Sequence, residues 1–149
     1  MLSSKAKYGL KAMVHLARRE AEGAVVIQEI ADAERIPKKF LDTILLELKL
    51  NGLLNSKKGK GGGYTLSRPA AQITVGNIVR ILDGPLAPVQ CVSRTAYRRC
   101  DDCQDENACA VRQVMGEVRD AISAILDHCS LADMILNSAK SVPILMYDI

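Results

Sequence analysis

Aromatic residues are nearly missing from this chain of 149 residues, which has no Trp, one Phe and four Tyr. Its core has to be filled by Leu, Ile, Val, Ala and Met, which favours helices packed on helices. No apolar run is long enough to span a membrane, and the first residues lack the apolar stretch of a secretion signal. We therefore expect a cytoplasmic, mainly α-helical protein with no membrane partner.

Catalytic constellations are missing as well. No nucleophile stands out with a base and an orienting partner, and the glycine-rich segment over 59–63 lacks the Walker signature of a nucleotide-binding loop. We expect no enzymatic activity.

Charge is present but unevenly placed. Residues 1–68 carry 13 Lys and Arg against 7 Asp and Glu, whereas residues 69–149 carry 7 against 10. A basic first half indicates a polyanion as partner. The same imbalance also arises by chance on a solvated surface, so it needs support from the order of the elements.

Apolar spacing and turn residues predict helices over 4–21, 28–34 and 37–50, a hairpin over 53–66 with a basic glycine tip, and a short helix over 75–82. Helix, turn, helix and hairpin is the order of a winged helix-turn-helix. We predict a mainly α fold with a small β-wing and assign residues 1–82 to a DNA-binding domain. Some protein-binding domains share this geometry.

In such a domain the second helix of the pair enters the major groove with its N-terminal end, and the wing approaches phosphates. Lys and Asp side chains on the helix can pair with base edges, and the start of the first helix can hold a phosphate. The predicted DNA contacts are Ser4, Lys5, Lys38, Lys39, Phe40, Asp42, Thr43, Lys57, Lys58, Lys60, Gly61, Gly62 and Tyr64.

Four of the five cysteines, Cys91, Cys100, Cys103 and Cys109, lie in a loop that we place at 83–110. In a reducing compartment such thiols indicate a metal or redox role rather than a disulfide framework. An iron–sulfur cluster takes four thiolates. Zinc also accepts four, although its sites commonly use two close pairs. A thiol–disulfide switch between Cys100 and Cys103 is the third reading.

The last long helix is predicted over 110–137, and the tail covers 138–149. An apolar stripe runs along the helix with steps of four and three residues: Val111, Met115, Val118, Ile122, Ile125 and Cys129. A domain this small has little of its own to cover so long a stripe, so we predict a dimerisation helix over 111–137 and a homodimer.

Several motifs resemble the IscR/NsrR/RirA group of bacterial winged-helix regulators. The matching segments are Ser4-Lys5-x-x-Tyr8, Ile30-Ala31 to Ile36, Asn51-Gly52-Leu53 and Gly59-Lys60-Gly61-Gly62-Gly63-Tyr64-Thr65-Leu66. The resemblance covers roughly residues 1–137. It implies a homodimer on a palindromic operator in double-stranded DNA and, in many members, a [2Fe–2S] or [4Fe–4S] iron–sulfur cluster held by three cysteines.

By order, Cys91, Cys103 and Cys109 match those three cysteines. The fourth ligand departs from the pattern, because Arg112 stands at the histidine position of IscR-like proteins and Tyr8 at the carboxylate position of NsrR-like ones. We therefore predict that Cys100 is the fourth ligand.

Together these features predict a homodimeric transcription regulator, such as a repressor, that senses iron–sulfur, redox or iron status through the four-cysteine loop. A regulator of the same fold controlled by zinc or by thiol–disulfide exchange is one alternative. An iron–sulfur or thiol redox carrier, whose basic half docks a protein partner, is the other.

Overall fold

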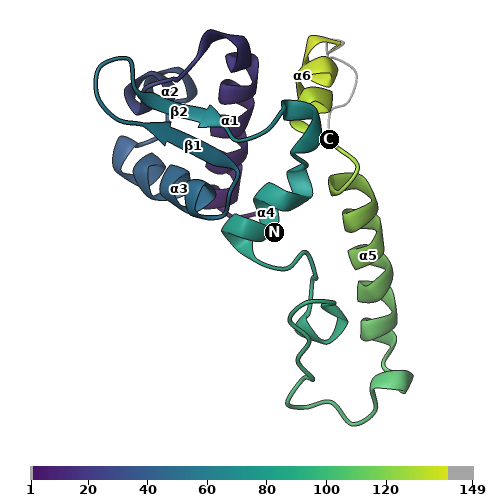
Figure 1. Cartoon of the computed structure of the whole chain (residues 1–149). Helices are drawn as coiled ribbons and strands as arrows, with labels where there is room; N and C mark the ends of the chain where they lie inside the picture. The colour runs from purple at the N-terminus through teal and green to yellow at the C-terminus, as the bar shows by residue number, and fades with distance from the viewer. Residues whose placement is uncertain (1, 141–149) are drawn as a thin grey trace.

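The computed structural model describes residues 2–140 and confirms a mainly helical fold with a small antiparallel sheet (Figure 1). Four short 3-10 helices, labelled η, lie between the larger elements. The elements in chain order are α1 (Ser4–Arg18), η1 (Glu20–Glu22), α2 (Ile27–Glu34), α3 (Lys38–Leu50), β1 (Leu54–Lys57), β2 (Gly63–Leu66), η2 (Ala70–Gln72), α4 (Val75–Asp83), η3 (Gln90–Val92), η4 (Glu106–Ala108), α5 (Ala110–Leu126) and α6 (Leu131–Ala139).

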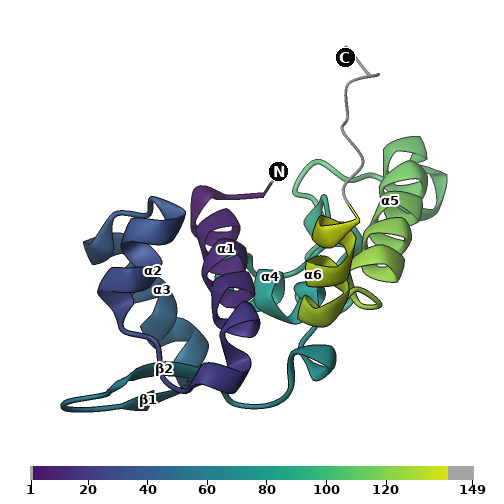
Figure 2. The same ribbon diagram turned by 90° about the horizontal axis from the view of Figure 1, so that it is seen from above.

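Helix α1 forms the centre of the predicted DNA-binding domain over residues 1–82, which we call the head. In the view from above it lies between the α2–α3 pair on one side and α4 with α6 on the other (Figure 2). Small residues let its neighbours approach, since Ala6 and Ala12 are fully buried and a Cβ on Gly9 would lie 2.1 Å from Leu82 Cδ1. Met13 and Leu16 fill the space between these contacts. The predicted helix end at 21 is three residues too far, because η1 follows Arg18 after a turn.

A tight turn joins α2 to α3. Arg35 ends α2 in the left-handed conformation at φ 55°, Ile36 is buried, and Pro37 is extended and precedes the first residue of α3. The buried side of α3 consists of the residues that the apolar spacing predicts, namely Leu41, Ile44, Leu45 and Leu48. Burial of this stripe holds the helix so that its opposite side faces outward.

The wing is a two-stranded hairpin whose register pairs Leu54 with Leu66 and Lys57 with Gly63. Its base is tied to the head, because Val25 and Tyr64 exchange two backbone hydrogen bonds of 3.0 and 2.8 Å. Val25 thus adds one residue of strand pairing to the edge of the wing.

The single helix predicted over 110–137 is two helices. Helix α5 ends at Leu126, and Ser130 starts α6 through a capping box with Asp133. Leu131 is fully buried, and its backbone N–H donates to the Ile73 carbonyl at 2.9 Å. Helix α6 therefore packs back on the head, while α5 stands beside it (Figure 1).

Most of the tail predicted over 138–149 lies outside the described residues, which end at Lys140. None of the described helices is both long and apolar enough to cross a membrane.

Candidate DNA-binding face and cysteine loop

The outward side of α3 carries the side chains predicted to read DNA. Lys38, Lys39, Asp42 and Thr43 are all exposed. Phe40 differs, because its ring packs edge-to-face on Tyr8 of α1 with centroids 5.6 Å apart. This contact joins α3 to α1 at the end of the helix that would enter a groove, so Phe40 also serves as a structural residue.

The start of α1 is fixed by Ser3 and Lys5. Ser3 is the N-cap residue, accepts from the Ala6 N–H at 3.0 Å, and donates its backbone N–H to Asp83 at 3.0 Å. Lys5 pairs with Glu47 of α3. Ser4 is exposed and Lys5 is half-buried, so of these two predicted phosphate contacts only Lys5 is held by an ion pair.

The wing presents Lys57, Lys58 and Lys60 as exposed side chains around its glycine tip. At Gly62 a Cβ would meet the Lys57 carbonyl oxygen at 2.2 Å, so the tip closes only around a residue without a side chain. The lysines therefore project from a turn whose backbone path is fixed by sterics.

Tyr64 lies in β2 of the wing, near α3, the helix predicted to read DNA and called the recognition helix. Burial of its ring raises the pKa of the Tyr64 hydroxyl above the ordinary value, and the charge of Asp42 on α3 adds to the effect. Strand β1 of the wing packs against α3. The structure brings the residues predicted on both elements to one side of the head.

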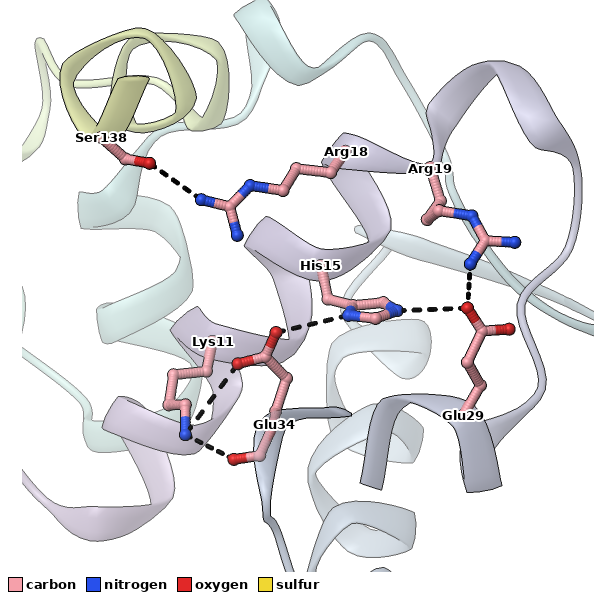
Figure 3. A network of polar contacts seen from close by, with 7 residues as sticks. All are labelled: Lys11, His15, Arg18, Arg19, Glu29, Glu34 and Ser138. Atoms are coloured by element: carbon pink, nitrogen blue, oxygen red, sulfur yellow. Dashed lines mark hydrogen bonds and ion pairs between the residues drawn. The ribbon is translucent and has the colours of Figure 1, made fainter. Parts of the chain in front are cut away.

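A polar network of seven residues holds α2 and α6 on α1 (Figure 3). Its centre is His15, whose side chain is 13% exposed and lies between two carboxylates of α2, with Nδ1 3.3 Å from Glu34 Oε1 and Nε2 3.6 Å from Glu29 Oε1. Arg19 pairs with the same oxygen of Glu29, and Lys11 donates to the Glu34 carbonyl at 2.5 Å.

On the same side of α1, Arg18 donates to Ser138 Oγ of α6 at 2.9 Å. The sequence shows His15 on the polar side of a helix, but its partners are about 15 to 20 residues away and no local spacing indicates them. The network fixes α2, the first helix of the helix-turn-helix, relative to α1.

The cysteine loop begins against the middle of α5. Cys91 is buried in η3, and Arg119 of α5 donates to the carbonyl of the next residue, Val92, at 2.7 Å. Arg94 adds an ion pair to Asp120 of α5 at 3.0 Å. The first part of the loop is therefore anchored to α5, whereas residues 94–102 are exposed.

Two further predicted ligands follow in the loop, Cys100 exposed and Cys103 half-buried. The pKa of the Cys100 thiol is raised chiefly by its interaction with Cys91, with Cys103 contributing less. The backbone N–H of Cys103 donates to the Cys100 carbonyl at 3.1 Å, so a backbone turn joins these two residues.

Cys109 lies at the N-cap of α5, where its sulfur accepts from the Arg112 N–H at 3.4 Å. Val92 packs near Gly116, seven residues further along α5, which is about 10 Å at 1.5 Å per residue. Over residues 2–140, no group of three or more Cys, His, Asp and Glu side chains is arranged to hold a metal ion. The donor chemistry suits a cluster or zinc, but the loop does not assemble the four thiols.

The outer side of α5 is apolar and exposed. Val111 is 63% exposed, Val118 37% and Ile125 67%, and Val114, which the predicted stripe does not contain, is 53% exposed. Next to it runs a groove of about 680 Å³ between α4 and α5. The groove is lined chiefly by Leu2, Val79, Leu86, Val118, Ile122 and Leu126.

Cys129 does not belong to this stripe. It lies between α5 and α6, and its carbonyl accepts from the Val75 N–H at 2.9 Å. The prediction that Cys129 continues the stripe is wrong, because the capping box at Ser130 ends the helical path first. Met115 and Ile122, also predicted on the stripe, are half-buried.

Comparisons with known proteins agree with this architecture. The model of the Rrf2 family, described as iron-dependent transcriptional regulators, matches residues 2–137. The rrf2-like HTH-type transcriptional regulator of Rhodobacter capsulatus is 43% identical over 138 residues, which cover 91% of this chain and 92% of that protein.

Solved structures of similar proteins agree with this architecture. The global cysteine regulator CymR of Bacillus subtilis superposes with a TM-score of 0.77 at 31% identity, covering 92% of this chain and 97% of that one. IscR of T. potens has a TM-score of 0.75 at 29% identity, covering 99% and 96%. An oxidized form of Staphylococcus aureus CymR has a TM-score of 0.70 at 28% identity, covering 95% and 98%. This chain belongs to the Rrf2 family of transcriptional regulators and is a winged-helix DNA-binding protein rather than an enzyme.

Proposed function

We propose that the chain acts as a homodimer on a palindromic operator and that the four-cysteine loop controls its affinity for DNA through an iron–sulfur cluster. The observation that carries the proposal is the placement of the loop. It is anchored on the middle of α5 through Arg119 and ends at Cys109, the N-cap of the same helix. A change at the thiols therefore acts on α5.

The exposed apolar side of α5 supports the dimer. Val111, Val114 and Ile125 are each more than half exposed. The α5 helix of a second subunit is the simplest partner that would bury such a stripe. In a symmetric dimer the two copies of α3 would be related by a twofold axis, as a palindromic duplex requires, with a separation of about 34 Å.

The thiols supply the donors for a cluster. Cys91, Cys100, Cys103 and Cys109 would hold it, and when bound it supplies a redox-active iron centre. Val92, the residue after Cys91, lies beside Gly116 in the middle of α5, whereas Cys109 is at the start of that helix, about 10 Å away along its axis. Joining all four requires the exposed part of the loop to move toward Cys109, or the start of α5 to move toward the loop.

Helix α5 connects this movement to the head. At its far end Asp127 receives two hydrogen bonds from Arg80 of α4, at 2.5 and 2.8 Å, and α4 packs on α1 and α3. A shift of α5 thus changes the position of α3 relative to the dimer axis. A few ångströms at α3 would weaken binding to a palindrome while leaving phosphate contacts within each head intact.

The experiment is anaerobic purification of the full chain, followed by visible absorption and by iron, sulfide and zinc analysis. We expect iron and sulfide with charge-transfer absorption in the wild type, and loss of both in Cys100→Ala but not in the control Cys129→Ala. Operators selected from random duplexes should then bind with different affinity before and after removal of the iron. A colourless, iron-poor wild type with unchanged operator binding would overturn the cluster proposal, and zinc at one ion per chain would replace it by the zinc form.

A second candidate rests on the interaction of the Cys91 and Cys100 thiols, which raises the pKa of Cys100. Two thiols that the loop brings together can lose two protons and two electrons to a peroxide or a disulfide and form one disulfide bond. The oxidized form solved for Staphylococcus aureus CymR makes redox control a reasonable mode in this fold. Mass spectrometry of the oxidised chain should find a Cys91–Cys100 linkage. If oxidation changes operator binding equally in Cys91→Ser, this candidate is wrong.

A further inference from the structure

The recognition helix exposes an apolar side chain that its DNA-binding role does not yet explain. Leu46 is 49% exposed and lies one turn beyond Asp42 and Thr43. Residues three and four apart on a helix share a side, so Lys39, Asp42, Thr43 and Leu46 form one continuous strip. The core side of α3 is occupied instead by Leu45 and Leu48, both fully buried.

Thr43 adds a second apolar group to this strip. Its hydroxyl donates to the Lys39 carbonyl at 3.5 Å within α3. With the hydroxyl directed to the helix backbone, the methyl group is the part of Thr43 that is left for an outside contact. The strip thus carries polar groups at Lys39 and Asp42 and, beyond them, apolar groups at Thr43 and Leu46.

In the major groove the only apolar group on a base edge is the C5-methyl of thymine. We infer that Thr43 and Leu46 read thymine methyl groups, so that the operator half-site carries thymines next to the bases that face Lys39 and Asp42. This inference rests on the proposed binding of an operator by α3. The exposed leucine on this strip is continuous with the side chains of α3 that are predicted to read DNA.

The test replaces thymine by uracil, which removes only the methyl group. Duplexes selected by the wild-type chain from a random library give the half-site, and each thymine is then changed to uracil in turn. We expect at least one position per half-site where the wild type loses affinity about fourfold, because burial of one methyl group contributes about 0.8 kcal/mol.

Leu46→Ala should bind the thymine duplex about as weakly as the wild type binds the uracil duplex, and the same uracil change should then cost it little. Leu50→Ala is the matched control, because Leu50 is 74% exposed at the last residue of α3, one turn further from the start of the helix. Leu50→Ala should lose as much affinity as the wild type does when thymine is replaced by uracil. Thermal melting checks that both variants fold as the wild type does.

Three results would overturn the inference while leaving operator binding by α3 in place: no uracil position lowers wild-type affinity, Leu46→Ala keeps the sensitivity, or Leu50→Ala loses it. If the wild type selects no duplex at all, the proposed function itself fails together with the inference.

Discussion

Single side-chain oxygens decide where several elements begin. Ser3, Thr74 and Ser130 each accept a backbone hydrogen bond in the first turn of a helix. The cap at Thr74 could be predicted, because a threonine precedes an apolar run directly. The cap at Ser130 was missed, since the apolar steps of α5 continue in sequence up to Cys129 and hide the break. A single N-cap residue can therefore end a helical path that the apolar spacing alone would continue.

Charge on single wing residues should affect DNA binding without regard to sequence. Lys60→Ala removes one exposed cation from the wing tip. We expect affinity for operator and random duplexes to fall by a similar factor, and the slope of log affinity against log salt to decrease in magnitude by about 0.9. Fluorescence anisotropy over a salt series measures both quantities. Lys140→Ala, at the end of α6, should change neither; a loss confined to the operator would contradict the phosphate role of Lys60.

At the scale of elements, the contact between α4 and the end of α5 holds the cysteine-bearing helix on the head. Arg80 and Asp127 form a bidentate pair across it, and Gly76 lets the two segments approach. Neither feature is visible in sequence, because the partners are about 50 residues apart. This pair couples the position of α5 to that of the head.

Two glycines in helices should respond in opposite directions to alanine. At Gly76 a Cβ would lie 2.0 Å from Asp127 Oδ1, whereas at Gly116 the nearest atom, Val92 Cγ1, is 4.0 Å away. Gly76→Ala should lower the free energy of unfolding by about 1–3 kcal/mol through overpacking. Gly116→Ala should raise it by about 0.5–1 kcal/mol, because alanine favours the helix. Urea unfolding measures both, and a destabilised Gly116→Ala would show that α5 lies closer to the loop than described.

The Arg80–Asp127 pair should make the free energy of unfolding depend on pH. The hydrogen bond from Arg80 lowers the pKa of the Asp127 carboxyl below its ordinary value. The resulting stabilisation is fully present above the carboxyl's unfolded pKa of about 4 and is lost as the pH falls through the lower folded pKa. With both side chains about one-third exposed, we expect about 1 kcal/mol.

The comparison variant for this pair is Asp127→Asn, which keeps the shape of the side chain but not its charge. Its free energy of unfolding should lie below that of the wild type at pH 7, and the difference should shrink toward pH 3 in urea titrations. A difference that is the same at both pH values would mean that packing, not the ion pair, is lost.

For the whole molecule, the arrangement of α5 beside the head determines what the chain can assemble into. The helix buries part of its surface against α4 and η3 and leaves the apolar stripe largely exposed. The adjoining groove of about 680 Å³ continues this apolar surface toward Leu2 and Leu86. Such a continuous patch is typical of a protein interface.

A charge on the exposed stripe should therefore separate the subunits. Ile125 is 67% exposed, so Ile125→Glu should fold normally but sediment as a monomer at concentrations where the wild type is a dimer. Affinity for a palindrome should fall toward that for one half-site. Sedimentation equilibrium and anisotropy measure the two effects. Gln113→Glu, which adds a charge to α5 away from the stripe, is the control, and a dimeric Ile125→Glu would refute the predicted interface.

Local patterns by themselves determined the helices of the head, the wing and the four thiols close together in the chain, because each depends on apolar spacing, turn residues or motif order within a few positions. The tertiary structure decided what depends on distant partners: the break before Ser130, the exclusion of Cys129 from the stripe, the place of His15 between Glu29 and Glu34, and the positions of Cys91 in η3 beside the middle of α5 and of Cys109 at its N-cap. Spacing records how far apart residues are along the chain, whereas burial and ion pairing depend on which surfaces meet after folding.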